Sequence, residues 1–552
     1  MYSSEPFPHF VEDYLAYLYE THPTQAAFDG VHAHDDLLED LSRSGIDTHT
    51  RDLAAFGRRL DSIDPAGLPD DERIDRAIVE ANIRARLFEL EEVRTWERDP
   101  QFYADLLSSS LAAQVLFTYA SEEERARRIH SKLRQLPRLL ESARENVREP
   151  PGLFVKVAVE TLRGVRTFVT NDLPRAFLTL DDVRLLSDLA DASTEAGQAI
   201  DAYVTHLEAE IAPRTKGSFR LGQTRFEQKL RLEEGLNIGG DRLLAIALRE
   251  LHETQEQFRK VATRLNGGDP VEAWRRAKQD HPKPGELIDT ARTQVAELAE
   301  FLRRQRLVTV PEGESVVVAA TPQFYRWTFA SMWTPGPFET RPGRAFYYLT
   351  DVDPQWSDER KEEHLREFNH GALWSISMHE VYPGHFLHFQ HLRQVASKVR
   401  RSIMFAPSSF VEGWAHYCEQ MMVEAGFGRR DDLIRLGQLA EALIRLVRCI
   451  VGIRLHMEDL SVEQGVRFFR DEAFMEEASA RREAERGTFD PTYVVYSAGK
   501  LMLLKLRADC EGREGDAYTL KGFHDRLLRN GSAPFWAQRR LMLGEETGAL
   551  LE

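Results

Sequence analysis

The chain has 552 residues, of which 42% are hydrophobic and 29% are charged, and its formal net charge is −17. This composition is typical of a globular protein that is long enough to bury a substantial core. The acidic balance argues against a nucleic-acid partner and against an anionic membrane surface, because both require a basic face. Only three cysteines, no leader-like start and no apolar run of about 20 residues lead us to expect a reduced, cytoplasmic protein without a membrane span.

Helical periodicity dominates the first 310 residues. Apolar residues recur at helical spacing over residues 74–90, 121–147, 182–212, 241–265 and 285–307. After a Pro-Glu-Gly-Glu break, residues 315–320 and 345–350 have the composition of strands, and helical patterns return after residue 360. The sequence therefore predicts a mainly α fold, with a helical N-terminal half (1–310) joined across a cleft to a second half (311–552) that carries a small sheet.

The most reactive residue types gather in two short segments of the second half. Residues 379–385 read His-Glu-Val-Tyr-Pro-Gly-His, and residues 412–417 read Glu-Gly-Trp-Ala-His-Tyr. Each segment lies in an apolar run, so its ionisable groups need partners inside the protein. Zinc is bound by imidazole nitrogen and carboxylate oxygen, and an acidic residue beside a ligand histidine can accept a proton from the metal-bound water. The two segments therefore predict one shared metal ion.

The spacing of the two histidines is unusual. Zinc peptidases usually place the second histidine four residues after the first, whereas His385 follows His379 by six. A step of six separates two side chains by roughly 120° on a regular helix, which is too far for them to share an ion. Pro383 and Gly384 can end or widen the helix, so we expect a helix over 371–382 and His385 turned back toward His379. The alternative is that Pro-Gly merely ends a helix that His385 caps.

A third segment, residues 491–500, reads Pro-Thr-Tyr-Val-Val-Tyr-Ser-Ala-Gly-Lys. Together the three segments resemble the bacterial family called domain of unknown function 885, which is similar to the clan of zinc peptidases whose third ligand is a glutamate. The resemblance implies a multi-helical, zinc-peptidase-like fold with the small sheet beside the active-site helix. It also implies that His379, His385 and Glu412 bind zinc and that Glu380 is the general base.

Four further residues bear on the predicted site. His416 lies one turn after Glu412 and is expected to orient it, although the family pattern usually has an apolar residue at this position. Glu419, two turns after Glu412, is either the acceptor of a proton from a ligand imidazole or an exposed charge. His388, just after the first motif, is either a further ligand or a hydrogen-bonded core group. Gly452 stands where we expect an acidic residue in the family.

Hydrolysis at zinc builds an oxyanion that a phenol or an imidazole can stabilise, and Tyr496 and His456 are the candidates for this role. A substrate carboxylate needs a cation, for which the candidates are Lys500, Arg454 and Arg507. The predicted strand at 345–350 contains Tyr347, and an edge strand beside the metal can pair with a substrate backbone. For each of these residues the alternative is an ion pair or a satisfied core group within the protein.

Three hypotheses for the function follow from these motifs. The leading one is a zinc-dependent peptidase that cleaves short peptides through a metal-activated water. The second is a metal-dependent amidase or esterase acting on a small non-peptide substrate, since zinc-bound water does not distinguish these bonds. The third is a non-catalytic helical binding protein whose metal site is degenerate.

Overall fold

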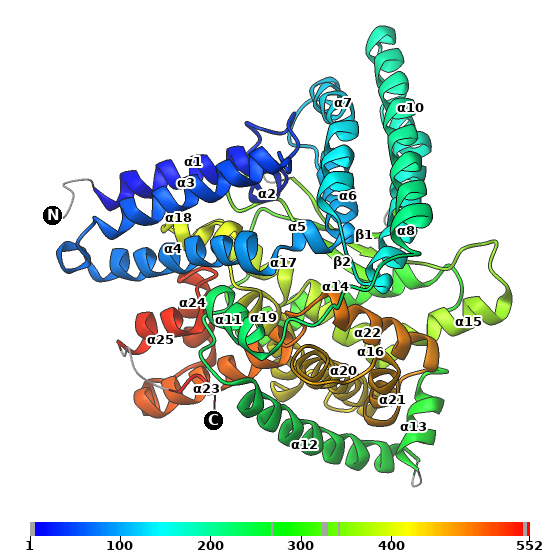
Figure 1. The fold of residues 1–552 in the computed structure, drawn as a ribbon. Helices are drawn as coiled ribbons and strands as arrows, with labels where there is room; N and C mark the ends of the chain where they lie inside the picture. Colours follow the sequence, from blue (N-terminus) through cyan, green and yellow to red (C-terminus); the bar gives the residue numbers. More distant parts are fainter. Residues whose placement is uncertain (1–5, 267–268, 323–328, 341–342, 545–548, 552) are drawn as a thin grey trace.

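The computed structural model describes residues 6–266, 269–322, 329–340, 343–544 and 549–551. In this part of the chain the fold is mainly helical, with one small sheet (Figure 1). None of the described helices is both long enough and apolar enough to cross a membrane.

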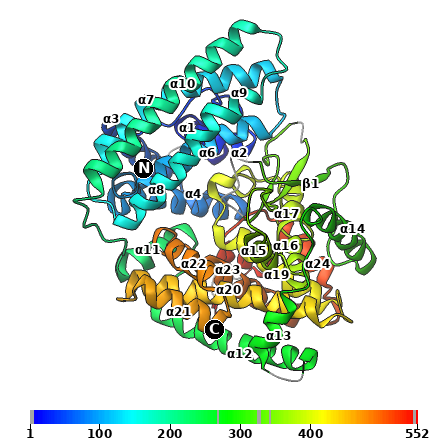
Figure 2. The same cartoon turned by 90° about the vertical axis from the view of Figure 1, so that its right-hand side faces the viewer.

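The N-terminal helices form two groups. Helices α1, α3 and α4 pack side by side, and α6, α7, α8 and α10 stand together as a bundle (Figures 1 and 2). The helices up to residue 206 are α1 (Phe7–Thr21), α2 (Pro23–Asp29), α3 (Arg43–Asp61), α4 (Asp70–Phe88), α5 (Thr95–Arg98), α6 (Pro100–Leu116), α7 (Glu122–Asn146), α8 (Gly152–Thr167), α9 (Leu173–Arg175) and α10 (Val183–His206).

Helices resume before and after the sheet. The first set is α11 (Gln223–Glu233), α12 (Gly240–Asn266), α13 (Pro270–Ala277) and α14 (Leu287–Gln305). The second set is α15 (Asp358–Glu367), α16 (His370–Glu380), α17 (His385–Leu392), α18 (Lys398–Arg401), α19 (Ser408–Glu424), α20 (Asp432–Met457), α21 (Val462–Ala473), α22 (Glu477–Phe489), α23 (Val495–Glu514), α24 (Leu520–Arg529) and α25 (Phe535–Leu543). The five helical stretches expected from apolar spacing coincide with α4, α7, α10, α12 and α14.

The sheet has three strands in the order β1-β3-β2. Strand β1 (Val316–Ala320) pairs in parallel with β3 (Ala345–Leu349), and β2 (Ala330–Trp333) pairs antiparallel with the other side of β3. The sequence patterns predict β1 and β3 but not β2, because the four-residue run Ala-Ser-Met-Trp lacks β-branched residues. Since β3 is the central strand, its backbone is already paired on both sides.

One apolar core surrounds the elements that carry the two motifs. It contains buried residues of β1, β3, α16, α19, α20 and α23, and it extends back to Phe226 in α11. A second core holds the α6–α10 bundle together, and a third joins the first helices to Phe405 and Ala537. Helices α11–α14, which precede residue 310, contribute buried residues to the same core as the second half. The domain boundary near residue 310 stays a prediction.

Candidate metal centre

The helix is interrupted between the two histidines of the first motif. Helix α16 begins after Asn369, whose side chain accepts a hydrogen bond from the Ala372 amide, and it ends at Glu380 rather than at residue 382. The amide of Gly384 then donates to the carbonyl of Met378 at 3.0 Å, and His385 is the first residue of α17. The helix therefore stops before Pro383, and His385 belongs to a new helix with its own direction.

Gly384 allows this interruption because the backbone there lies tightly against the end of α16. A Cβ atom at residue 384 would lie 1.6 Å from the carbonyl oxygen of His379, which no side chain tolerates. The preceding carbonyl, that of Pro383, accepts a hydrogen bond from the Trp414 indole at 2.9 Å and contacts the Cys418 thiol at 3.6 Å. Both partners lie on α19, so the turn is fixed to the helix that carries the second motif.

The three predicted zinc ligands converge. The rings of His379 and His385 are 4.8 Å apart and nearly perpendicular. Their Nε2 atoms lie 3.3 Å and 3.6 Å from the same carboxylate oxygen of Glu412, and one donor atom from each of the three residues lies within 4.8 Å of the others. The Glu412 side chain is 25% exposed and the His385 side chain 14% exposed, so solvent reaches the cluster.

These residues fit a zinc ion on chemical grounds. The Oε2 atom of Glu412 is buried and makes no hydrogen bond of normal geometry, although it faces two imidazole nitrogens. Burial alone would raise the pKa of Glu412, but His385 and His379 hold it well below its usual range. Two imidazoles and one carboxylate that converge on one point form a donor set used by catalytic zinc.

Glu419 supports the cluster from the inside. Its side chain is fully buried, so the alternative of an exposed charge is wrong. The Nδ1 atom of His379 lies 2.8 Å from Oε1 of Glu419, and the Ser375 hydroxyl donates to Oε2 at 2.8 Å. Burial alone would raise the pKa of Glu419, but the Arg445 guanidinium at 3.3 Å lowers it well below its usual range. A carboxylate on Nδ1 orients the ring so that Nε2 faces Glu412.

The environment of His379 is therefore strongly negative. Burial alone would lower the pKa of this imidazole, but the nearby carboxylates of Glu412 and Glu419 raise it to about 9. The positive charge of Arg445 limits this rise in the pKa of His379, because its guanidinium lies 3.5 Å from Nδ1. Arg445 also pairs with Glu441 at 2.6 Å. Arg445 is not among the residues predicted from the sequence, where its only signal is a cation within the apolar pattern of α20.

His416 does not orient Glu412 as expected. Its Nδ1 atom lies 3.3 Å from Oε1 of Glu419, one turn further along the same helix. The ring is fully buried, and burial lowers its pKa to about 3. His416 is therefore a neutral group behind Glu419.

Glu380 and Tyr347 lie at the other end of the site. Glu380 is the last residue of α16, directly after His379, and its side chain is partly exposed. Tyr347 is fully buried with its hydroxyl 3.3 Å from Ser377, and burial and the Glu380 charge raise its pKa. Tyr347 therefore packs α16 onto the sheet. Its strand, β3, cannot pair with a substrate backbone, because it is already paired with β1 and β2.

Tyr496 is the predicted oxyanion group that lies near the cluster, because its ring centre is 6.0 Å from the guanidinium of Arg445, which itself contacts His379 and Glu419. Burial raises its pKa, and the charge of Glu412 raises it further. The distance between the Glu412 and Tyr496 backbones is set by a close crossing of α19 and α23. At this crossing a Cβ on Gly499 would lie 1.9 Å from the carbonyl oxygen of Ser409 and 2.8 Å from the Cα of Gly413. Only glycine fits at this contact, which holds the Glu412 and Tyr496 backbones at a fixed separation.

His456 and Arg454 lie outside the cluster, so their predicted roles are wrong. His456 hydrogen bonds to the Gly487 carbonyl at 2.9 Å, and Arg454 lies 3.8 Å from Glu458. Both residues are on α20, and His456 is eleven positions after Arg445, or about 16 Å along the helix axis. The apolar pattern identified the helix but not how far along it the site lies.

Three other candidates also make contacts elsewhere. Lys500 is buried behind the cluster, where burial lowers its pKa to about 8, and does not line an open surface. Arg507 bonds to Glu424 at 3.1 Å, and His388 bonds to the Ser532 hydroxyl at 3.0 Å. For these three residues the structure supports the alternative stated in the sequence analysis, a core group or an ion pair within the protein.

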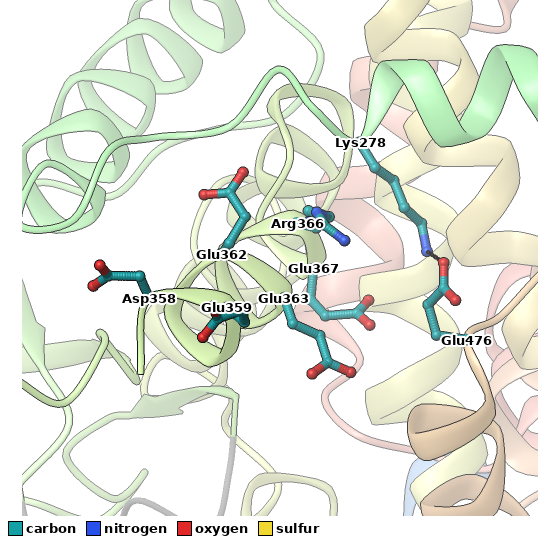
Figure 3. Close-up of a pocket in the computed structure, with 8 residues that line it drawn as sticks. All are labelled: Lys278, Asp358, Glu359, Glu362, Glu363, Arg366, Glu367 and Glu476. Carbon is teal, nitrogen blue, oxygen red and sulfur yellow. Dashed lines mark ion pairs between the residues drawn. The ribbon is translucent and has the colours of Figure 1, made fainter. Parts of the chain in front are cut away.

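A separate acidic cavity of about 570 Å³ opens beside α15 (Figure 3). Lys278 in its wall lies 4.0 Å from Glu476. The other lining residues are Asp358, Glu359, Glu362, Glu363, Arg366 and Glu367. None of the residues of the metal cluster lines this cavity, and an excess of surface carboxylates is expected in a chain of net charge −17.

The family described as "Bacterial protein of unknown function (DUF885)" matches the chain over residues 23–541. The chain belongs to this family. No curated protein matches this DUF885 chain. Its fold is similar to a putative lipoprotein of unknown function from Shewanella oneidensis, with a TM-score of 0.80 and 25% identity over 98% of this chain and 100% of the other. It is also similar to a putative lipoprotein from Colwellia psychrerythraea, with a TM-score of 0.81 and 16% identity over 97% and 98% of the two chains.

Proposed function

We propose that this protein is a zinc-dependent hydrolase and, most specifically, a peptidase that cleaves short peptides. The observation that carries the proposal is the convergence of His379, His385 and Glu412, with Glu380 adjacent on the same helix end. His379, His385 and Glu412 would hold the ion. Zinc bound there would polarise a substrate carbonyl and make a coordinated water acidic.

The protein side chains supply the remaining chemistry. Glu380 follows a ligand histidine directly and is partly exposed, so its carboxylate can accept a proton from the attacking water and pass it to the leaving amine. Tyr496 lies near Glu412 and, with its raised pKa, keeps a hydroxyl proton to donate to the developing oxyanion. The Glu419 carboxylate accepts from Nδ1–H of His379 and so keeps the tautomer that presents Nε2 to the ion, while Arg445 pairs with Glu419.

Metal content and turnover test the proposal separately. We expect about one zinc per chain in protein purified without chelator, and we expect His379→Ala or Glu412→Gln to remove most of it. Glu380→Gln should keep the zinc and slow the hydrolysis of a mixed short-peptide library by a factor of roughly 10² or more. A wild-type protein that binds no zinc at micromolar concentration would refute the proposal in favour of a binding protein. Cleavage of small amides or esters with no cleavage of peptides would refute the peptidase assignment alone.

A further inference from the structure

Three arginines surround Tyr496. The Arg445 and Arg448 guanidiniums lie 6.0 Å and 5.3 Å from its ring centre, and Arg486 donates from Nη2 to its hydroxyl at 3.4 Å. Arg486 is on α22, which packs against α20 beside α23 (Figure 2). Tyr496 therefore stands between the Glu412 side of the metal cluster and a group of cations.

Only one of these arginines is placed to meet a ligand. The Arg448 side chain is 15% exposed and forms two bonds, at 2.7 and 2.8 Å, with the carboxylate of Glu483. Arg445 is 8% exposed and pairs with two carboxylates of the core, as described above. Arg486 is 38% exposed; among the described residues Asp490 is the carboxylate with which it pairs, at 3.1 Å, and its guanidinium lies 5.1 Å from the ring centre of Tyr493.

The guanidinium of Arg486 also keeps binding capacity. Within the described part of the chain both of its hydrogen bonds, to Asp490 and Tyr496, use Nη2. Asp490 is itself held by the Thr492 hydroxyl at 2.7 Å, so it fixes the direction of the guanidinium. The Nε and Nη1 atoms keep their donor hydrogens, and either can form a single charge-assisted hydrogen bond with a carboxylate.

We propose that Arg486 binds the free carboxylate of the C-terminal residue of the substrate, which makes the enzyme a carboxypeptidase. This inference rests on the proposed peptidase function. In the proposed function the Tyr496 hydroxyl contacts the scissile carbonyl. Nη2 of Arg486 lies 3.4 Å from this hydroxyl. The carboxylate of a terminal residue is about one residue spacing, roughly 3.8 Å, beyond the scissile carbonyl. In the reaction the water oxygen bonds to the acyl carbon, the C–N bond breaks and the amine takes a proton, which releases one amino acid.

The first test compares matched peptides that differ only at the C-terminus. N-acetylated tripeptides of mixed sequence are supplied as free acids and as C-terminal amides, and the products are quantified by mass spectrometry. We expect the wild type to cleave the acids about tenfold faster, judged by kcat/KM, because a charge-assisted bond is lost in the amides. Arg486→Gln should abolish this preference by raising KM for the acids more than KM for the amides, whatever its effect on the rate that both substrate classes share. Arg486→Lys should restore part of the preference.

Arg481→Gln is the matched control. Arg481 lies on the same helix but pairs with Glu463 and Glu477 away from Tyr496, so its loss should leave both substrate classes unchanged. An acid preference that survives in a folded Arg486→Gln variant, or a wild type that prefers amides, overturns the inference while leaving the peptidase proposal intact.

A binding measurement separates this inference from the proposed function. The zinc-loaded Glu380→Gln variant is titrated calorimetrically with the same peptides, and we expect the acids to bind about tenfold more tightly than the amides. If no peptide is cleaved by the wild type but the acids still bind preferentially through Arg486, the peptidase proposal fails and the anchor stands. Equal binding of acids and amides overturns the anchor.

Discussion

Glu419→Gln tests whether the buried carboxylate behind His379 controls the metal site. The amide has the shape of the carboxylate but carries no charge, so His379 loses its anionic partner at 2.8 Å and Arg445 keeps only Glu441. Removing one member of a buried ion pair costs about 3–5 kcal/mol, and we expect the low end because Glu441 remains. Losing the partner that orients a ligand histidine lowers metal affinity by about 10- to 100-fold.

Two measurements follow these effects. Competition with a chromogenic chelator gives the zinc affinity, and urea denaturation of the metal-free protein gives the free energy of unfolding. Glu424→Gln is the control on the same helix, because Glu424 is 40% exposed and its pair with Arg507 should contribute less than about 1 kcal/mol. Unchanged zinc affinity in a folded Glu419→Gln variant would refute the role of Glu419 in orienting the ligand.

Three further predictions concern other parts of the structure. Gly384→Ala should lower zinc content and destabilise the protein by about 1–3 kcal/mol, because the new Cβ meets the His379 carbonyl; full zinc occupancy and an unchanged melting temperature would contradict this. His456→Gln should keep wild-type zinc content and turnover per folded molecule, measured by elemental analysis and peptide assay. For His32, burial alone would lower the pKa, but hydrogen bonds to carboxylates such as Asp35 raise it to about 8 from 6.5, an effect worth about 2 kcal/mol. This stabilisation is fully present below pH 6.5 and is lost as the pH rises through about 8, so the difference in urea stability between the wild type and His32→Gln should shrink between about pH 6 and pH 9.

Much of the fold could be predicted because the apolar residues of amphipathic helices recur at a regular spacing in the sequence. Helices α7 and α12 lie within one or two residues of the expected bounds, since each has one apolar and one charged face. Strand β2 was missed because four residues are too few to establish a period. Its pairing with β3 depends on a partner that lies outside any local window.

Within the site, residues in the short motifs were easier to predict than residues on long buried helices. His379 and Glu412 stand out because each is an ionisable group within an apolar run. Helix α20 is apolar on most sides over 26 residues, so its pattern does not show which cations face the cluster. From the sequence, Arg454 is a candidate for binding a substrate carboxylate, whereas the cation of α20 that contacts Glu419 and His379 is Arg445. Arg486 gave no signal either, because α22 reads as an ordinary charged surface helix.

The glycine crossing of α19 and α23 gives the site a narrow mechanical tolerance. Where helices usually meet through interlocking side chains, a change in one residue is absorbed by its neighbours. Here the backbones of Gly413 and Gly499 are in direct contact, with no side chains between them that could adjust. An added methyl group would therefore push the two helices apart and change the distance between the Glu412 carboxylate and the Tyr496 hydroxyl. Helix α22 is not part of this contact. If the proposed function holds, residues on α22 can therefore change substrate preference without changing the spacing between Glu412 and Tyr496.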